Sequence, residues 1–169
     1  MSYKNLPFGS IDAFNVVIEI PKGSQNKYEY DEELDLIKLD WVFTDGFCFP
    51  FDYGYIPETR GGDGDHLDAF VLSSIPIEIG TICQCRAIGI IKLLDRGEED
   101  DKILAIPLAD PQLKNIQSLE DFKENYEKIF REFFKELEKQ KNKIIEIKEF
   151  SDSTKAKEEL VIAHRIFNK

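Results

Sequence analysis

The pattern of hydrophobic and polar positions changes its period near residue 118. Before that point, short alternating or continuously apolar runs predict β-strands. The expected strands cover residues 15–21, 27–31, 36–39, 69–72, 81–94 and 103–107. The run over 81–94 should bend at Gly89 and pair with 103–107 across an acidic turn, which is a hairpin pattern.

After residue 118 the period becomes helical. Ser118 and Asp121 form a variant of the capping box. They are followed by an apolar stripe of Phe122, Tyr126, Ile129, Phe130, Phe133 and Leu137. We therefore expect a helix of about twenty residues starting at Ser118. A short strand over 143–150 and a last helix capped by Ser153 should complete the chain.

Many strands followed by two helices are typical of an α+β fold or of a barrel with added helices. The 169 residues suffice for one domain with a real core, and no internal repeat or linker divides them. We therefore expect a single domain over residues 1–169.

The segment 47–55 places an aromatic residue at every odd position: Phe47, Phe49, Phe51, Tyr53 and Tyr55. In an extended chain these side chains share one face, and most of them should belong to the core. The two tyrosine hydroxyls need a polar partner if buried, or can serve a ligand.

The charge of the chain narrows its possible partners. The formal net charge is −11, which argues against nucleic acid or an anionic membrane as the main partner. No secretory signal and no apolar run of about 20 residues is seen. Cys48, Cys83 and Cys85 show no zinc-binding spacing, so we expect reduced thiols in a cytoplasmic protein.

The stretch GGDGDHLDAFVL, residues 61–72, concentrates the candidate chemistry. Its glycines allow a sharp turn that brings Asp63, Asp65 and Asp68 together ahead of a buried strand. Crowded carboxylates repel one another unless protons or cations neutralise them, and Mg²⁺ or Mn²⁺ prefers such oxygen ligands. A solvated acidic turn stays open as an alternative. An EF-hand does not, because its required positions hold Leu67, Asp68 and Ser74.

Other charged residues extend this cluster into one candidate site. Asp95 and Asp100 lie in a second acidic turn, between the runs 81–94 and 103–107, and Glu19 and Glu29 lie in expected strands. Lys27 and Lys102 accompany these acids, and lysines bind phosphate as point charges. This set of acids and lysines would suit metal ions that hold the attacking and leaving groups of an in-line displacement at phosphorus. The sequence alone does not show that the loops meet.

Several segments in order resemble the soluble family I inorganic pyrophosphatases of the short bacterial type. The motif D-[small or polar]-D-x-[apolar]-D-[apolar] is matched by residues 63–69. VVIEIP, KYE, FPFDYGYIPET, the turn D-x4-D-x-K over 95–102 and ILAIP are all similar to family segments. The spacing of these segments fits the family over residues 15–107. FFKELE in the expected helix is also similar to a family segment, whereas the similarity of the C-terminal tail is weaker.

The resemblance implies a small, highly twisted OB-like β-barrel flanked by two helices. It also implies hydrolysis of pyrophosphate with Mg²⁺, and Mn²⁺ as a possible substitute. Asp65 would be the general base. Asp63, Asp68, Asp95, Asp100 and Glu19 would hold metals, and Lys27, Tyr53, Lys102 and Lys135 would bind phosphate. Glu29 and Tyr55 would support them. Members of the bacterial family are usually hexamers, so the resemblance also implies a homo-hexamer.

Three departures from the family fall on phosphate-binding positions. Trp41 replaces an arginine, and Phe49 and Phe134 replace tyrosines; Asp52 also stands where an asparagine is usual. An indole cannot supply a charged bidentate donor. Reduced activity, an altered substrate and a non-catalytic relative that binds metal and phosphate therefore stay open. An OB-like nucleic-acid module is disfavoured by the charge.

Overall fold

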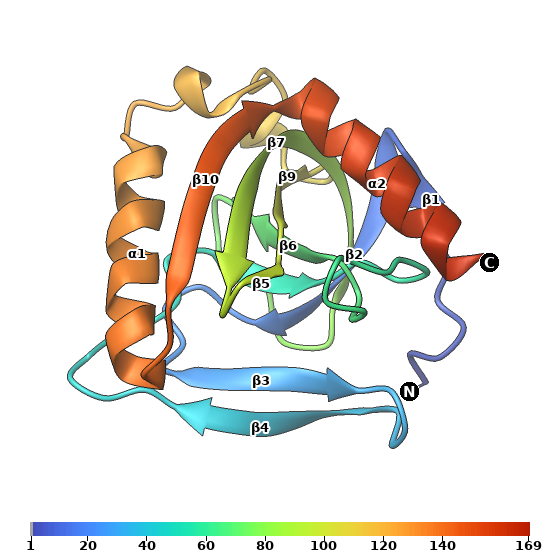
Figure 1. The fold of residues 1–169 in the computed structure, drawn as a ribbon. Coiled ribbons are helices and arrows are strands. Elements are labelled where there is room, and N and C mark those ends of the chain that lie inside the picture. The colour runs from blue at the N-terminus through green and yellow to red at the C-terminus, as the bar shows by residue number, and fades with distance from the viewer. Residues whose placement is uncertain (1) are drawn as a thin grey trace.

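The computed structural model describes residues 2–169. Its centre is a closed barrel in which β2 (Ala13–Ile20), β5 (Asp52–Tyr55), β6 (Asp68–Val71), β9 (Lys102–Pro107) and β7 (Ile82–Asp95) pair in that order. A further pairing between β2 and β7 closes the ring (Figure 1). The predicted α+β fold with an OB-like barrel is confirmed.

The neighbours in this ring are antiparallel except for β6 and β9, which run parallel. β10 (Ile145–Asp152) extends the sheet beyond β7, β1 (Gly9–Ser10) pairs with β2, and β8 (Glu98–Glu99) pairs with the end of β7. The register of β7 against β9 shifts between Ala87 and Gly89, which confirms the predicted bend. A bulge of this kind increases the local twist and helps the sheet to close.

A separate two-stranded hairpin, β3 (Asn26–Asp31) and β4 (Leu36–Val42), lies beside the barrel (Figure 1). Asp35 has a positive φ in its turn, and the Asp35 carboxylate accepts a hydrogen bond from the Tyr30 hydroxyl. The hairpin makes contacts with β2 through β3. It brings its polar face to one end of the barrel.

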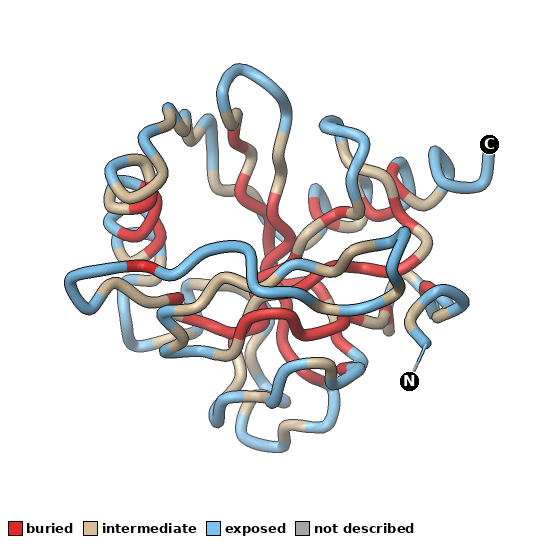
Figure 2. The backbone as a smooth tube through the Cα atoms, turned by 90° about the horizontal axis from the view of Figure 1, so that it is seen from below, coloured by how far each residue is buried: buried red, intermediate tan, exposed pale blue. Residues whose placement is uncertain are grey.

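The two helices each cover a part of the barrel. α1 (Tyr126–Lys141) packs Phe130, Phe133, Phe134 and Leu137 against an aromatic cluster that includes Phe49 and Phe70. α2 (Ser153–Phe167) buries Ala156, Leu160 and Ala163 against the other core cluster. Figure 2 shows buried residues along the barrel strands and on one side of α1. Neither helix has the length and apolarity that a bilayer crossing requires within residues 2–169.

The start of α1 differs from the prediction. The Asp121 carboxylate does accept from the Ser118 N–H at 2.9 Å, as in a capping box, but this box closes only the 3-10 turn η2 (Leu119–Asp121). Phe122 is extended, and the chain turns again at Asn125, whose side chain caps α1 by accepting from the Lys128 N–H. Another 3-10 turn, η1 (Pro111–Leu113), precedes this region.

Two smaller features also differ. The segment 47–55, which is not among the expected strands, contains the strand β5, and Phe49, Phe51 and Tyr55 are buried as expected of core residues. α2 is capped by Asp152, which accepts from the Thr154 and Lys155 N–H groups, and not by Ser153.

Candidate active site

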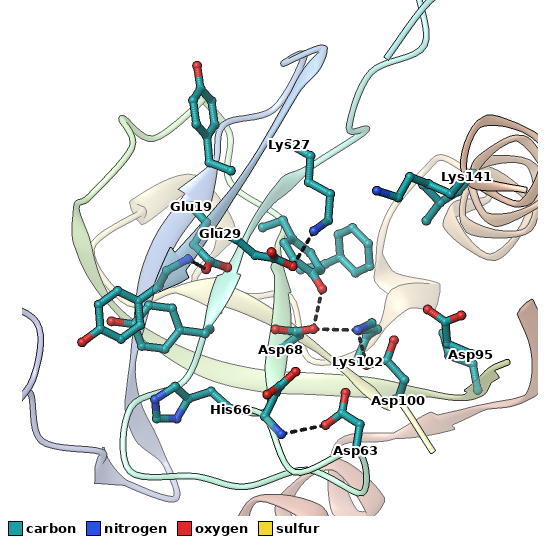
Figure 3. A pocket seen from close by; sticks show the side chains of 18 of the residues that line it. Glu19, Lys27, Glu29, Asp63, His66, Asp68, Asp95, Asp100, Lys102 and Lys141 are labelled. Carbon is teal, nitrogen blue, oxygen red and sulfur yellow. Dashed lines mark hydrogen bonds and ion pairs between the residues drawn. The ribbon is translucent and has the colours of Figure 1, made fainter. Parts of the chain in front are cut away.

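A cavity of about 820 Å³ opens at one end of the barrel, between the β3–β4 hairpin and the end of α1 (Figure 3). Ten acidic and seven basic residues line it. Because carboxylates outnumber the cationic groups, the cavity is suited to receive additional cations. The two acidic turns and the two strand acids of the predicted site all meet here.

The loop before β6 presents its aspartates through backbone hydrogen bonds. The Gly61 N–H donates to the Asp65 carbonyl at 2.8 Å, and the Asp65 N–H donates to the Asp63 carboxylate at 3.0 Å. Gly64 has a φ of +90°, which favours glycine. Asp65 itself is exposed, and these bonds use only its backbone, so its carboxylate is left for a ligand or water.

Asp68, the first residue of β6, lies at the centre of a short hydrogen-bond network. Its carboxylate accepts from the Tyr53 hydroxyl at 2.5 Å and from the Lys102 ammonium at 2.6 Å. Lys102 also donates to Asp100 at 2.5 Å. Tyr53 comes from β5 and Lys102 from β9, the two strands that flank β6, so the barrel itself sets this geometry.

The second acidic turn contributes Asp95, the last residue of β7. Asp95 pairs with Lys143 at 2.5 Å through one carboxylate oxygen. The other oxygen, Oδ1, is buried and has no hydrogen-bond partner in the described chain. A buried carboxylate oxygen without a partner costs free energy, so this atom indicates a missing ligand.

The hairpin and β2 supply the opposite wall. Lys27 donates to Glu29 at 2.6 Å and to Asp40 at 2.9 Å, so Lys27 and Glu29 lie on the same face of β3. Glu19, on β2, is 5% exposed and accepts from the Tyr30 N–H at 2.7 Å. The Tyr55 hydroxyl is buried without a partner in the described residues.

The cavity raises the pKa of several acids. Burial raises the pKa of Glu19 to about 8, and the Asp68 charge adds to this effect. Burial also raises the pKa of Asp63, with further repulsion from Asp100 and Asp68. For Lys102 burial acts to lower the pKa, but the negative charges of Asp68 and Asp100 outweigh it and raise the pKa, so the ammonium stays protonated.

Of four further residues singled out from the sequence, two lie outside the cavity lining and two lie within it. Lys135 is exposed on α1 and is not among the residues that line the cavity. Trp41 is 43% exposed and also lies outside the lining. Phe49 and Phe134 do line the cavity, and both are buried in the aromatic cluster beneath it.

Sequence reasoning missed two lysines and a histidine. Lys141 and Lys143 line the cavity from the end of α1 and the turn after it, and the basic run KQKNK was their available signal. His66 lies between the Tyr55 ring, at a centroid distance of 5.0 Å, and Glu32, which it meets at 3.0 Å. Glu32 also pairs with Arg60 at 2.7 Å, so this group joins the hairpin tip to the acidic loop.

The described side chains can be compared with the needs of a metal ion, and the observations point in two directions. Across residues 2–169, no three acidic, histidine or cysteine side chains gather closely enough around one point to hold an ion as they lie. In the described arrangement the Lys102 ammonium bridges Asp68 and Asp100. The unpartnered Asp95 oxygen, the excess of carboxylates and the raised pKa of Glu19 nonetheless fit a site for hard divalent cations.

Comparisons with known proteins agree with one another. The family model described as inorganic pyrophosphatase matches residues 16–168. The chain is 44% identical to the inorganic pyrophosphatase of Saccharolobus solfataricus, covering 88% of each chain. It is 46% identical to that of Thermoplasma volcanium, covering 77% of this chain and 80% of the relative.

Solved structures of inorganic pyrophosphatases are also similar to this chain in three dimensions. The inorganic pyrophosphatase of Thermus thermophilus superposes with a TM-score of 0.92 at 35% identity, covering 100% of both chains. That of Coxiella burnetii gives 0.90 at 36% identity, covering 96% of this chain and 99% of the other.

Proposed function

Because the chain belongs to the inorganic pyrophosphatase family, we propose that it hydrolyses pyrophosphate to two phosphate ions in the cavity around Asp68. The observation that carries this proposal is that both acidic turns, distant in sequence, open into one cavity together with lysines. Carboxylate oxygens are the ligands that hard divalent cations prefer, and lysine ammonium groups bind phosphate oxygens.

The acids of the cavity would hold different metal ions according to their position. Asp63, Asp68 and Asp100 would hold a first Mg²⁺, with Asp68 shared with a second, and Asp95 and Glu19 would hold ions that accompany the substrate. Mn²⁺ is the expected substitute. Magnesium, when bound, supplies charge for the phosphoryl oxygens and lowers the pKa of a bound water.

Asp65 would accept the proton of the attacking water. Its carboxylate is exposed in the cavity, and the loop's hydrogen bonds engage its backbone, so the side chain is free to act as a general base. Tyr53 would hold Asp68 in place through its 2.5 Å hydrogen bond and reach phosphate from the same position. Glu29 and Tyr55 would orient Lys27 and Glu19.

Lysines would bind the phosphate oxygens. Lys27 and Lys102 already donate to carboxylates in the cavity, and entry of divalent cations would compete for those carboxylates and release ammonium donors. Lys135, expected from the resemblance to bind phosphate, would need to swing from its exposed position.

Phosphate release from pyrophosphate with Mg²⁺ tests the proposal. We expect turnover that is abolished by EDTA and restored by excess Mg²⁺, with ATP as the comparison substrate. Metal and analogue binding without phosphate release would identify a non-catalytic relative. Faster release from ATP than from pyrophosphate would identify an altered substrate.

Three broader expectations also belong to this proposal: a single domain, a homo-hexamer and a cytoplasmic location. Each stays a prediction. Light scattering of the purified protein at several concentrations would measure its oligomeric state directly.

A further inference from the structure

Lys141 is the last residue of α1, and its side chain enters the cavity from the helix side (Figure 3). The helix stops there because Asn142 adopts the left-handed conformation, with its N–H bonded to the Glu138 and Lys139 carbonyls. The ammonium therefore comes from a defined helix end rather than from a free loop. Figure 3 shows it directed toward the ammonium of Lys27.

Lys141 differs from the other lysines of the cavity in its partners. Five lysines line the cavity, and four of them donate to a carboxylate at 2.5–2.9 Å: Lys27, Lys38, Lys102 and Lys143. Lys141 lies 3.6 Å from the Asp40 carboxylate, which is within ion-pair range but longer than a hydrogen bond. Its N–H donors thus stay available to an anion.

The position of this ammonium is set by Trp41 and Asp40, adjacent residues of β4. Lys141 Nζ lies 4.2 Å from the centre of the Trp41 ring, which is cation–π geometry. Asp40 shares its carboxylate between Lys27 and Lys141, and these two cations lower its pKa although burial acts to raise it. Trp41 lies outside the cavity lining, so its ring contacts Lys141 without lining the cavity itself.

We propose that Lys141 is a substrate-binding residue of this chain, an ammonium held over the Trp41 ring to meet a phosphate oxygen of pyrophosphate. The inference rests on the proposed function. A cation whose only carboxylate partner is a long ion pair is poorly placed to help bind Mg²⁺, and it is well placed to bind the anion that Mg²⁺ accompanies. Trp41, which replaces the family's arginine, is then a positioning residue that acts through Lys141.

Lys141→Met, Lys141→Arg and the matched control Lys139→Met test this role. Lys139 is an exposed lysine on the same last turn, paired with Glu136 and outside the cavity lining, so its substitution removes the same charge from the same helix. Affinity for methylenediphosphonate, a pyrophosphate analogue that is not hydrolysed, would be measured by calorimetry with saturating Mg²⁺. The KM and kcat for pyrophosphate would be measured beside it.

We expect Lys141→Met to weaken analogue binding and raise KM by about ten- to a hundredfold, with Mg²⁺ affinity unchanged. Lys141→Arg should recover most of the loss, and Lys139→Met should bind like the wild type. Equal binding by Lys141→Met and Lys139→Met, with both folded by circular dichroism, would overturn the proposal. So would a wild type that does not bind the analogue.

A double-mutant cycle separates the role of Trp41. Trp41→Leu should weaken analogue binding in the wild-type background and have no further effect in Lys141→Met, because its contribution passes through the ammonium. Additive effects would overturn the positioning role. A wild type that binds the analogue through Lys141 but releases no phosphate would refute the proposed function while supporting this inference.

Discussion

Asp68 and Lys102 meet because the parallel pairing of β6 with β9 sets their Cα atoms opposite each other, and the Lys102 ammonium lies 2.6 Å from the Asp68 carboxylate. Lys102 is only 4% exposed and also contacts Asp100. One buried cation thus balances two carboxylates at the centre of the cavity. Removing either the cation or the carboxylates would leave the remaining charge without its partner, which costs free energy.

Lys102→Met should destabilise the metal-free protein by about 3–5 kcal/mol, because it removes the buried cation that balances two half-buried carboxylates. Urea unfolding in EDTA measures this. Excess Mg²⁺ should recover part of the loss by taking the place of the ammonium. The exposed Lys139→Met is the control and should change stability by about 1 kcal/mol or less. Equal stability of the two variants in EDTA would refute the prediction.

Glu19→Gln should stabilise the metal-free protein increasingly as the pH rises from about 4.5 to about 8. In that range the unfolded carboxyl is ionised, whereas burial keeps the folded one protonated, so folding of the wild type loses stability with rising pH. The loss is complete above the folded pKa. The neutral amide of the variant has no such cost and can still accept from the Tyr30 N–H. At pH 8 the gain is on the order of a few kcal/mol.

Asp52→Asn is the matched comparison for Glu19→Gln. Asp52 is also fully buried and its pKa is raised by burial, but it accepts from the Lys22 and Ile77 N–H groups outside the cavity lining. Both variants should gain stability in EDTA. Saturating Mg²⁺ should cancel the gain only for Glu19→Gln, because the metal stabilises the ionised Glu19 of the wild type. A gain that Mg²⁺ leaves unchanged would remove Glu19 from the metal site.

Asp65→Asn should lower kcat for pyrophosphate by about 10²–10⁴-fold, since an amide cannot accept the proton of the attacking water. Mg²⁺ affinity, measured by calorimetry, should change little. Asp45→Asn is the control, because Asp45 is an exposed turn residue outside the cavity lining. Turnover of Asp65→Asn near that of the control would exclude Asp65 as the base.

Gly54→Ala should destabilise the barrel by about 3 kcal/mol or more, because the added methyl would lie 1.9 Å from the Val17 carbonyl oxygen on β2. The strand cannot move away without breaking the β2–β5 pairing. Gly97→Ala, at an open turn with positive φ, should cost only about 1 kcal/mol. Thermal unfolding of both variants provides the comparison, and equal costs would show that β2 and β5 are not packed this closely.

The sequence by itself determined the local elements and the identity of the acids. Strand positions and the 3.6-residue stripe of α1 follow from period alone, and Gly64 with its neighbouring aspartates predicts a tight acidic loop because few other residues adopt a positive φ. The same reasoning placed the start of α1 too early. Ser118 and Asp121 can cap a 3-10 turn as well as an α-helix, and the local pattern does not distinguish them.

Only the tertiary structure decided which of these residues share the cavity. Asp68 and Lys102 are brought together by β6–β9 pairing, a contact between segments that no local period encodes. The direction of α1 against the aromatic cluster decided that Lys141 enters the cavity while Lys135 faces solvent. Helical period assigns lysines to faces of a helix, but which face meets the barrel depends on packing between distant parts of the chain.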